Sequence, residues 1–98
     1  MLLVLGTTLG GAELTGFISD AACGWNNARN NPEARECAVK CVKAGWDPVF
    51  IRDGDMNAYK ISNKAKVMSF VGDQVVINGS LTKADVIVRT IRKVSPRR

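Results

Sequence analysis

The stretch Cys23–Gly45, CGWNNARNNPEARECAVKCVKAG, holds all three cysteines of the 98-residue chain. It also carries the one convincing long helix of the sequence. Asn31 can cap that helix, Pro32 is favoured at a first helical position, and Gly45 can end it in the left-handed conformation. The pattern therefore predicts a helix over about residues 32–44.

Cys37 and Cys41 lie on the apolar stripe of the predicted helix, so both thiols are expected to face inward. A disulfide from Cys23 to either of them is the favoured interpretation, because it would close a loop of 15 to 19 residues. Cys37 and Cys41 are poor partners for each other, since positions i and i+4 of a regular helix do not readily meet disulfide geometry. The sequence predicts a disulfide that joins the loop to the helix.

Three other roles for the cysteines stay open. All three could bind a metal ion, with Asp20 as a fourth ligand, although C-x3-C is not a standard zinc spacing. They could be small core residues, or the odd cysteine could form an intermolecular disulfide. A redox-active thiol is the last role, with Arg35 and Lys40 as the nearby cations. The sequence predicts no cofactor and favours no metal site.

Composition excludes several classes of function. The chain has no histidine, which removes the commonest general base and any Ser-His or Cys-His pair. Aromatic residues make up 6% of the chain, too few for an extended base-stacking surface. The formal net charge of +5 is spread over short groups and favours a solvated surface over an anionic partner. We expect a protein that is not an enzyme.

Outward from the central stretch, the chain shows short strand patterns separated by turns. These patterns predict an all-β, OB-like barrel of five strands, with the helix inserted between the first and second strands. Residues 13–94 form the predicted single domain, and residues 95–98 a basic tail. The predicted strands are 14–19, 49–51, 57–61, 74–77 and 86–94, with a turn or sharp bulge at 78–80 and a short helix within 63–70.

The loop from Asp20 to Asn31 is long for so small a domain, which often indicates function or cross-linking. Its candidate ligand-binding residues are Trp25, Asn26, Asn27 and Arg29. For Trp25, and for Trp46 beyond the helix, core packing against the helix is nevertheless favoured over a ligand platform. Asp20 is expected to have a surface role.

The first twelve residues, MLLVLGTTLGGA, contain no charge and open with an apolar run. They are similar to the hydrophobic half of a secretory signal with a small-residue cleavage site, although a basic n-region is missing. A first strand over residues 2–5 is the alternative. No apolar run reaches the length needed to cross a bilayer, so no transmembrane segment is predicted.

Several stretches, taken in order, carry a family resemblance: LTGFISDAAC, ECAVKCVKAG, PVFI, YKISN, FVGDQVVINGSL and VIVRTI. They resemble a family of small exported bacterial proteins of unknown function. The resemblance implies an OB-like barrel with a cysteine-bearing insertion after the first strand, and an exported setting. In that family the loop after the first cysteine often carries a histidine; none is present here, which weakens a metal role by analogy.

Together these features predict a small exported, non-enzymatic binding module, periplasmic or secreted, for an unknown protein or small-molecule ligand. One alternative is a thiolate metal-binding protein. The other is single-stranded nucleic-acid binding on the barrel, which is not favoured because it would need exposed aromatic side chains. Phe17, Phe50 and Tyr59 are the candidates for those side chains.

Overall fold

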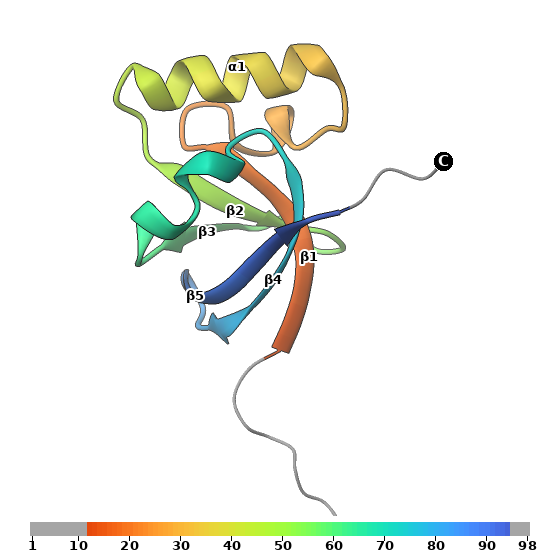
Figure 1. Ribbon diagram of the computed structural model, residues 1–98, viewed down its shortest axis with the longest axis vertical. Coiled ribbons are helices and arrows are strands. Elements are labelled where there is room, and N and C mark those ends of the chain that lie inside the picture. Colours follow the sequence, from red (N-terminus) through yellow and green to blue (C-terminus); the bar gives the residue numbers. More distant parts are fainter. Residues whose placement is uncertain (1–11, 95–98) are drawn as a thin grey trace, which may run out of the picture.

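The computed structural model describes residues 12–94, which form a closed five-stranded barrel with one α-helix (Figure 1). The strands are β1 (Ala12–Asp20), β2 (Pro48–Arg52), β3 (Ala58–Ile61), β4 (Gln74–Leu81) and β5 (Asp85–Lys93). Their order around the barrel is β1-β2-β3-β5-β4. The predicted all-β, OB-like barrel is therefore confirmed. The helices are α1 (Pro32–Lys43) and three 3-10 turns, η2 (Gly24–Asn27), η3 (Lys64–Lys66) and η4 (Met68–Phe70).

Strand β1 organises the barrel because it pairs along its length with two neighbours. It is antiparallel to β2, with Phe17 opposite Ile51, and antiparallel to β4, with Leu14 opposite Ile77. The barrel closes where β3 meets β5 in a short parallel ladder, with Ile61 opposite Val86. The strand ends nearest the insertion are therefore the carboxyl end of β1 and the start of β2.

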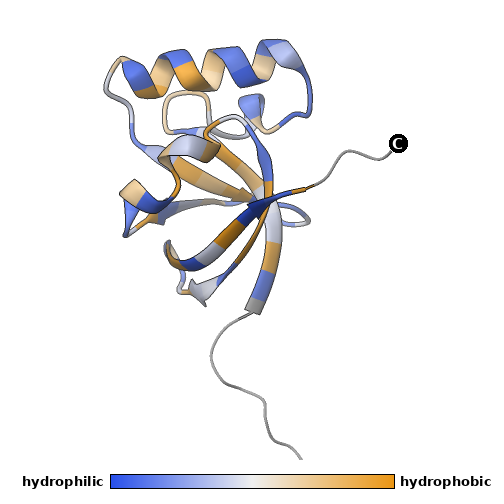
Figure 2. Ribbon diagram, in the orientation of Figure 1, coloured by the Kyte–Doolittle hydropathy of each residue, from blue (hydrophilic) through white to orange (hydrophobic). Residues whose placement is uncertain are grey.

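Hydrophobic and hydrophilic residues are mixed along the strands (Figure 2). Buried residues alternate with more exposed ones along β3, β4 and the first half of β5, whereas β2 is buried from Pro48 to Ile51. In β4, for example, Val75 and Ile77 are buried while Val76 between them is partly exposed. This alternation is expected for a barrel strand with one side facing the core and the other facing solvent. The largest fully buried side chains include Phe50, Ile18, Ile51, Ile77, Val67, Val75, Val86 and Val88.

Two glycines allow strands to approach closely at positions where a side chain would not fit. A Cβ atom on Gly16 would lie 2.1 Å from the carbonyl oxygen of Ile51, and one on Gly79 would lie 2.1 Å from that of Ile87. The register between β4 and β5 shifts at Asn78 and Gly79. The predicted turn or bulge at residues 78–80 is thus a bulge inside one continuous strand.

Helix α1 lies across one end of the barrel, above the strands (Figure 1). Its cap is as predicted: the side chain of Asn31 accepts a hydrogen bond from the Ala34 N–H at 2.8 Å, and Pro32 opens the helix. Only two of its side chains, Ala34 and Ala38, are buried. Val39 and Val42 are partly buried and also pack against the core. The apolar contact of the helix with the barrel is therefore thin, because it consists of small or partly buried side chains.

Replacing the cap tests how much Asn31 contributes to the stability of the helix. We expect Asn31→Ala to lower the free energy of unfolding by about 1 kcal/mol, because the Ala34 N–H loses its partner at the start of the helix. The control is Asn30→Ala, an exposed asparagine one residue earlier, which should change it by less than about 0.5 kcal/mol. Urea unfolding measures both, and equal effects would contradict the capping role.

The predictions for the two ends of the chain lie outside the described residues. These are the signal-like segment or strand in residues 1–12, of which Ala12 alone is described, as the first residue of β1, and the basic tail of residues 95–98. Within residues 12–94, no helix is both long and apolar enough to cross a membrane.

Candidate functional site: a three-cysteine cluster

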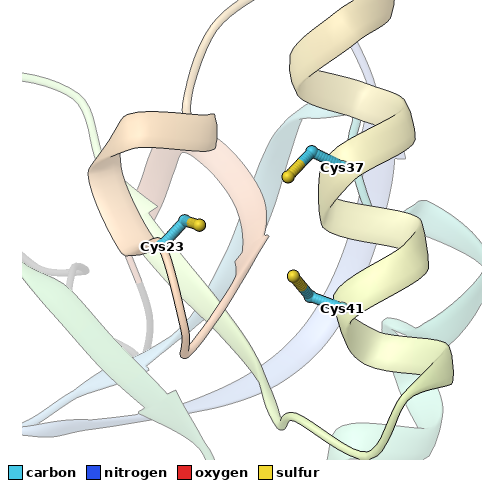
Figure 3. Close-up of side chains that lie close together, drawn as sticks. All are labelled: Cys23, Cys37 and Cys41. Atoms are coloured by element: carbon cyan, nitrogen blue, oxygen red, sulfur yellow. The ribbon is translucent and has the colours of Figure 1, made fainter.

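The three cysteines meet in the space between α1 and the loop that follows β1 (Figure 3). Cys37 and Cys41 project from successive turns of α1, and Cys23 faces them from the loop. Their three Sγ atoms all lie within 4.8 Å of one another. Each side chain is half-buried, so the cluster is sheltered and still reachable from solvent. The insertion thus brings together three thiols that are up to 18 positions apart in the sequence.

Cys23 is held in place by a buried carboxylate. Asp20, at the end of β1, is fully buried, and its Oδ1 accepts hydrogen bonds from the N–H groups of Ala22 at 3.0 Å and Cys23 at 2.8 Å. Its Oδ2 accepts a hydrogen bond from Asn27 Nδ2 at 2.8 Å. The loop is therefore folded around this carboxylate, and the predicted surface role for Asp20 is wrong.

Two further hydrogen bonds attach the loop to the barrel. Ser19 Oγ donates to the carbonyl of Gly24 at 2.7 Å, and the Ala21 N–H donates to the carbonyl of Asp47 at 2.9 Å. At the far end of α1, the Trp46 N–H donates to the carbonyl of Cys41 at 3.1 Å. The backbone on both sides of the cluster is therefore fixed by hydrogen bonds that do not involve sulfur.

The structure contains no sulfur–sulfur bond, and all three cysteines are free. The predicted disulfide from Cys23 to Cys37 or Cys41 therefore stays a prediction. The arrangement does place Cys23 near both helical sulfurs at once. The metal-site alternative from sequence requires all three thiols to lie together in this way.

The environment favours the protonated form of the Cys41 and Cys23 thiols, because it raises the pKa of both. Partial burial raises the pKa of Cys41 most, and Asp20, Cys37 and Cys23 raise it further, to about 11. Burial and then Asp20 also raise the pKa of Cys23. Arg35, a suggested thiol activator, instead forms an ion pair with Asp73 at 3.4 Å. These contacts therefore do not support the redox-active thiol that was considered from sequence.

These pKa directions predict how the thiols react. At pH 7 we expect Cys41 to be alkylated by iodoacetamide far more slowly than free cysteine, because little of it is thiolate. Asp20→Asn removes a negative charge that raises the pKa of Cys41 and Cys23, so it should speed alkylation of both. Peptide mapping at increasing pH gives the rates. The control is Asp53→Asn, the same charge change at an exposed position in the β2–β3 turn; equal rates in both variants would contradict the assigned effect.

The loop residues proposed from sequence differ in their surroundings. Trp25 is 57% exposed, and Asn26 and Arg29 are also exposed, so these three remain available to a ligand. Asn27 is buried and bonded to Asp20, so its observed role is to hold the loop. Trp46 is 53% exposed. The prediction that both tryptophans pack into the core is therefore wrong.

The barrel wall offers none of the stacking residues considered for nucleic-acid binding. Phe17, Phe50 and Tyr59 are all buried in the core. Tyr59 also donates its hydroxyl hydrogen to Asp55 at 3.2 Å. Base stacking needs exposed aromatic faces, so these three residues do not support that alternative.

Comparison of the chain with family models, with curated proteins and with solved structures found no match. The function must therefore be argued from the site.

Proposed function

We propose that this protein is a small, non-enzymatic binding module whose ligand is a thiophilic metal ion held by Cys23, Cys37 and Cys41. The observation that supports the proposal is the convergence of three sulfur atoms to within 4.8 Å of one another. Three sulfurs about 2.3 Å from a common ion in a plane would be about 4.0 Å apart. The side chains therefore need to move by less than about 1 Å to enclose an ion.

The chemistry of the donors supports the same ligand class. Thiolates select soft or borderline ions such as Cu(I) and Zn(II) over Mg²⁺ and Ca²⁺, which prefer oxygen ligands. Two of the donors are one helical turn apart on α1, a spacing that lets both reach one ion. The third comes from a loop that Asp20 already holds in place. Such preorganisation lowers the entropy cost of binding.

Titration with Cd(II), a soft ion whose thiolate bonds absorb in the ultraviolet, tests the proposal. With reduced protein we expect absorbance to rise linearly and stop at one ion per chain. Cys41→Ser should weaken binding by at least tenfold, since a hydroxyl is a poor ligand for a soft ion. Lys40→Ser places the same new side chain at the neighbouring exposed position and should bind as the parent does. Absence of a break at one ion per chain would contradict the proposal.

The disulfide predicted from sequence is the second candidate, and the thin contact of α1 with the barrel favours it. Only Ala34 and Ala38 of the helix are buried. A bond from Cys23 to Cys37 or Cys41 would contribute roughly 3 kcal/mol by closing a short loop. In this role the chain is an exported binding module, periplasmic or secreted, whose exposed loop residues Trp25 and Arg29 face an unknown partner.

Intact mass after alkylation of the unfolded, unreduced protein distinguishes the two candidates. A structural disulfide leaves one cysteine to be labelled, whereas the metal-binding form carries three labels once the ion is removed with a chelator. Protein should be taken directly from its native compartment, because the redox state of that compartment decides whether the disulfide persists. A single label in all molecules would favour the disulfide candidate.

A further inference from the structure

The number of protein donors around the cluster indicates which ion it takes. The chain contains no histidine. Within residues 12–94, the three cysteines form the group that could hold a metal ion, and no carboxylate joins it. Among residues 12–94, no Cys, Asp or Glu side chain offers a fourth ligand atom to this group. The site therefore differs from closed four-ligand zinc sites, in which the protein supplies every donor.

Asp20, which the sequence suggested as a fourth ligand, already accepts hydrogen bonds on both carboxylate oxygens. Its two oxygens accept three hydrogen bonds, from the N–H groups of Ala22 and Cys23 and from Asn27 Nδ2. Turning this carboxylate toward an ion would leave the buried Asn27 amide and the partly buried N–H groups of Ala22 and Cys23 without this partner, which is unfavourable. Asp20 therefore acts as a positioning residue that fixes the backbone of Cys23.

The backbone carbonyls of Cys23 and Cys41 also accept hydrogen bonds. The carbonyl of Cys23 accepts a hydrogen bond from the Asn26 N–H at 3.1 Å, and the carbonyl of Cys41 accepts those of Ala44 and Trp46, each at 3.1 Å. These hydrogen bonds form the turn after Cys23 and close the end of α1. Among the Cys, Asp and Glu side chains of residues 12–94, the group that meets here consists of the three cysteine sulfurs (Figure 3).

Resting on the proposed function, we infer that the cluster is a three-coordinate, all-sulfur site for a single Cu(I) ion. Monovalent copper is soft and is satisfied by two or three thiolates, whereas Zn(II) in protein sites is almost always four-coordinate. Zn(II) would need a water molecule to complete its shell here. Cu(I) needs nothing beyond the three sulfurs, and the thiol protons that it displaces leave to solvent.

X-ray absorption on the full chain, reduced and loaded without oxygen, tests this inference. After addition of one equivalent of Cu(I), we expect a first shell of three sulfurs with no oxygen or nitrogen and no copper neighbour. The Zn(II)-loaded protein should show three sulfurs and one lighter atom. One equivalent of Cu(I) should displace the bound Zn(II) completely. Cys37→Ser should lower the number of sulfurs around Cu(I) to two, while Lys40→Ser keeps three.

Three results would overturn the inference and leave the proposed function intact. They are Zn(II) that stays bound against one equivalent of Cu(I), a copper shell that includes oxygen or nitrogen, and more than one copper ion per chain. If neither Cu(I), Zn(II) nor Cd(II) binds at one ion per chain, the proposed function fails together with the inference. Circular dichroism of each ion-free variant shows whether it is folded, and Cys37→Ala gives a second test if the serine variant is not.

Discussion

Phe50→Ala is expected to lower the free energy of unfolding by about 3–5 kcal/mol. Phe50 is fully buried in β2, opposite Ile18 of β1 and Tyr59 of β3, so its ring fills the barrel beneath the insertion. Small domains are stable by only about 5–15 kcal/mol, so this loss would remove a large share of the total stability. Urea unfolding followed by circular dichroism measures the loss.

Ile87→Ala provides the control for this core substitution. Ile87 is 53% exposed on β5, and its truncation removes an apolar side chain that contributes little to the core. We expect a change within about 0.5 kcal/mol. A loss at Ile87 as large as that at Phe50 would mean that the barrel interior is not where the core lies.

A bound ion should raise thermal stability strongly. Binding to the folded state at a free concentration one thousand times the dissociation constant adds about 4 kcal/mol, less any binding to the unfolded thiols. For a domain of this size each kcal/mol moves the midpoint by about 4–8 °C, so we expect saturating Cd(II) to raise it by more than about 10 °C. The physical reason is that the ion joins Cys23 to α1, which otherwise has a thin contact with the barrel.

Single substitutions distinguish a rise in thermal stability caused by an ion at the cluster from one caused by ions bound elsewhere on the surface. Cys23→Ser should abolish most of the rise, because the loop then has no sulfur to share with the helix. Asn26→Ser, an exposed position in the same loop, should keep the full rise. Equal rises in both variants, recorded by differential scanning calorimetry, would show that the ion binds elsewhere.

The fold was accessible from sequence because its signals are local. The cap at Asn31, Pro32 after it and the alternation in β4 each depend on a few neighbouring residues. The helix predicted over 32–44 is observed as Pro32–Lys43. The short helix expected within residues 63–70 is instead two 3-10 turns, η3 and η4, which reflects how few residues are available there.

The site was less accessible because its contacts depend on tertiary structure. Asp20 follows a strand and precedes a polar loop, a context that indicates a surface carboxylate. Its burial is stabilised by Asn27, seven residues later, through a side-chain pair that no local pattern predicts. The periodicity of α1 did place Cys37 and Cys41 on one face. Only the folded loop brings Cys23 to them.

The exposed tryptophans mark a second limit of sequence reasoning. Large aromatic residues are usually buried, so Trp25 and Trp46 were expected in the core. The core cluster is instead made of Phe50, Tyr59 and smaller apolar residues, and neither indole ring belongs to it. Which apolar residues a small core excludes depends on its total volume, and a local pattern does not contain that information.

The most direct test of the central claim is protection of the three thiols from alkylation. Reduced protein is loaded with one equivalent of Cu(I) without oxygen, treated with iodoacetamide and mapped by peptide mass spectrometry. The three-cysteine site predicts that Cys23, Cys37 and Cys41 are protected together and lose protection together when a chelator removes the ion. Alkylation of any one of them at its ion-free rate in the loaded protein would contradict a shared site.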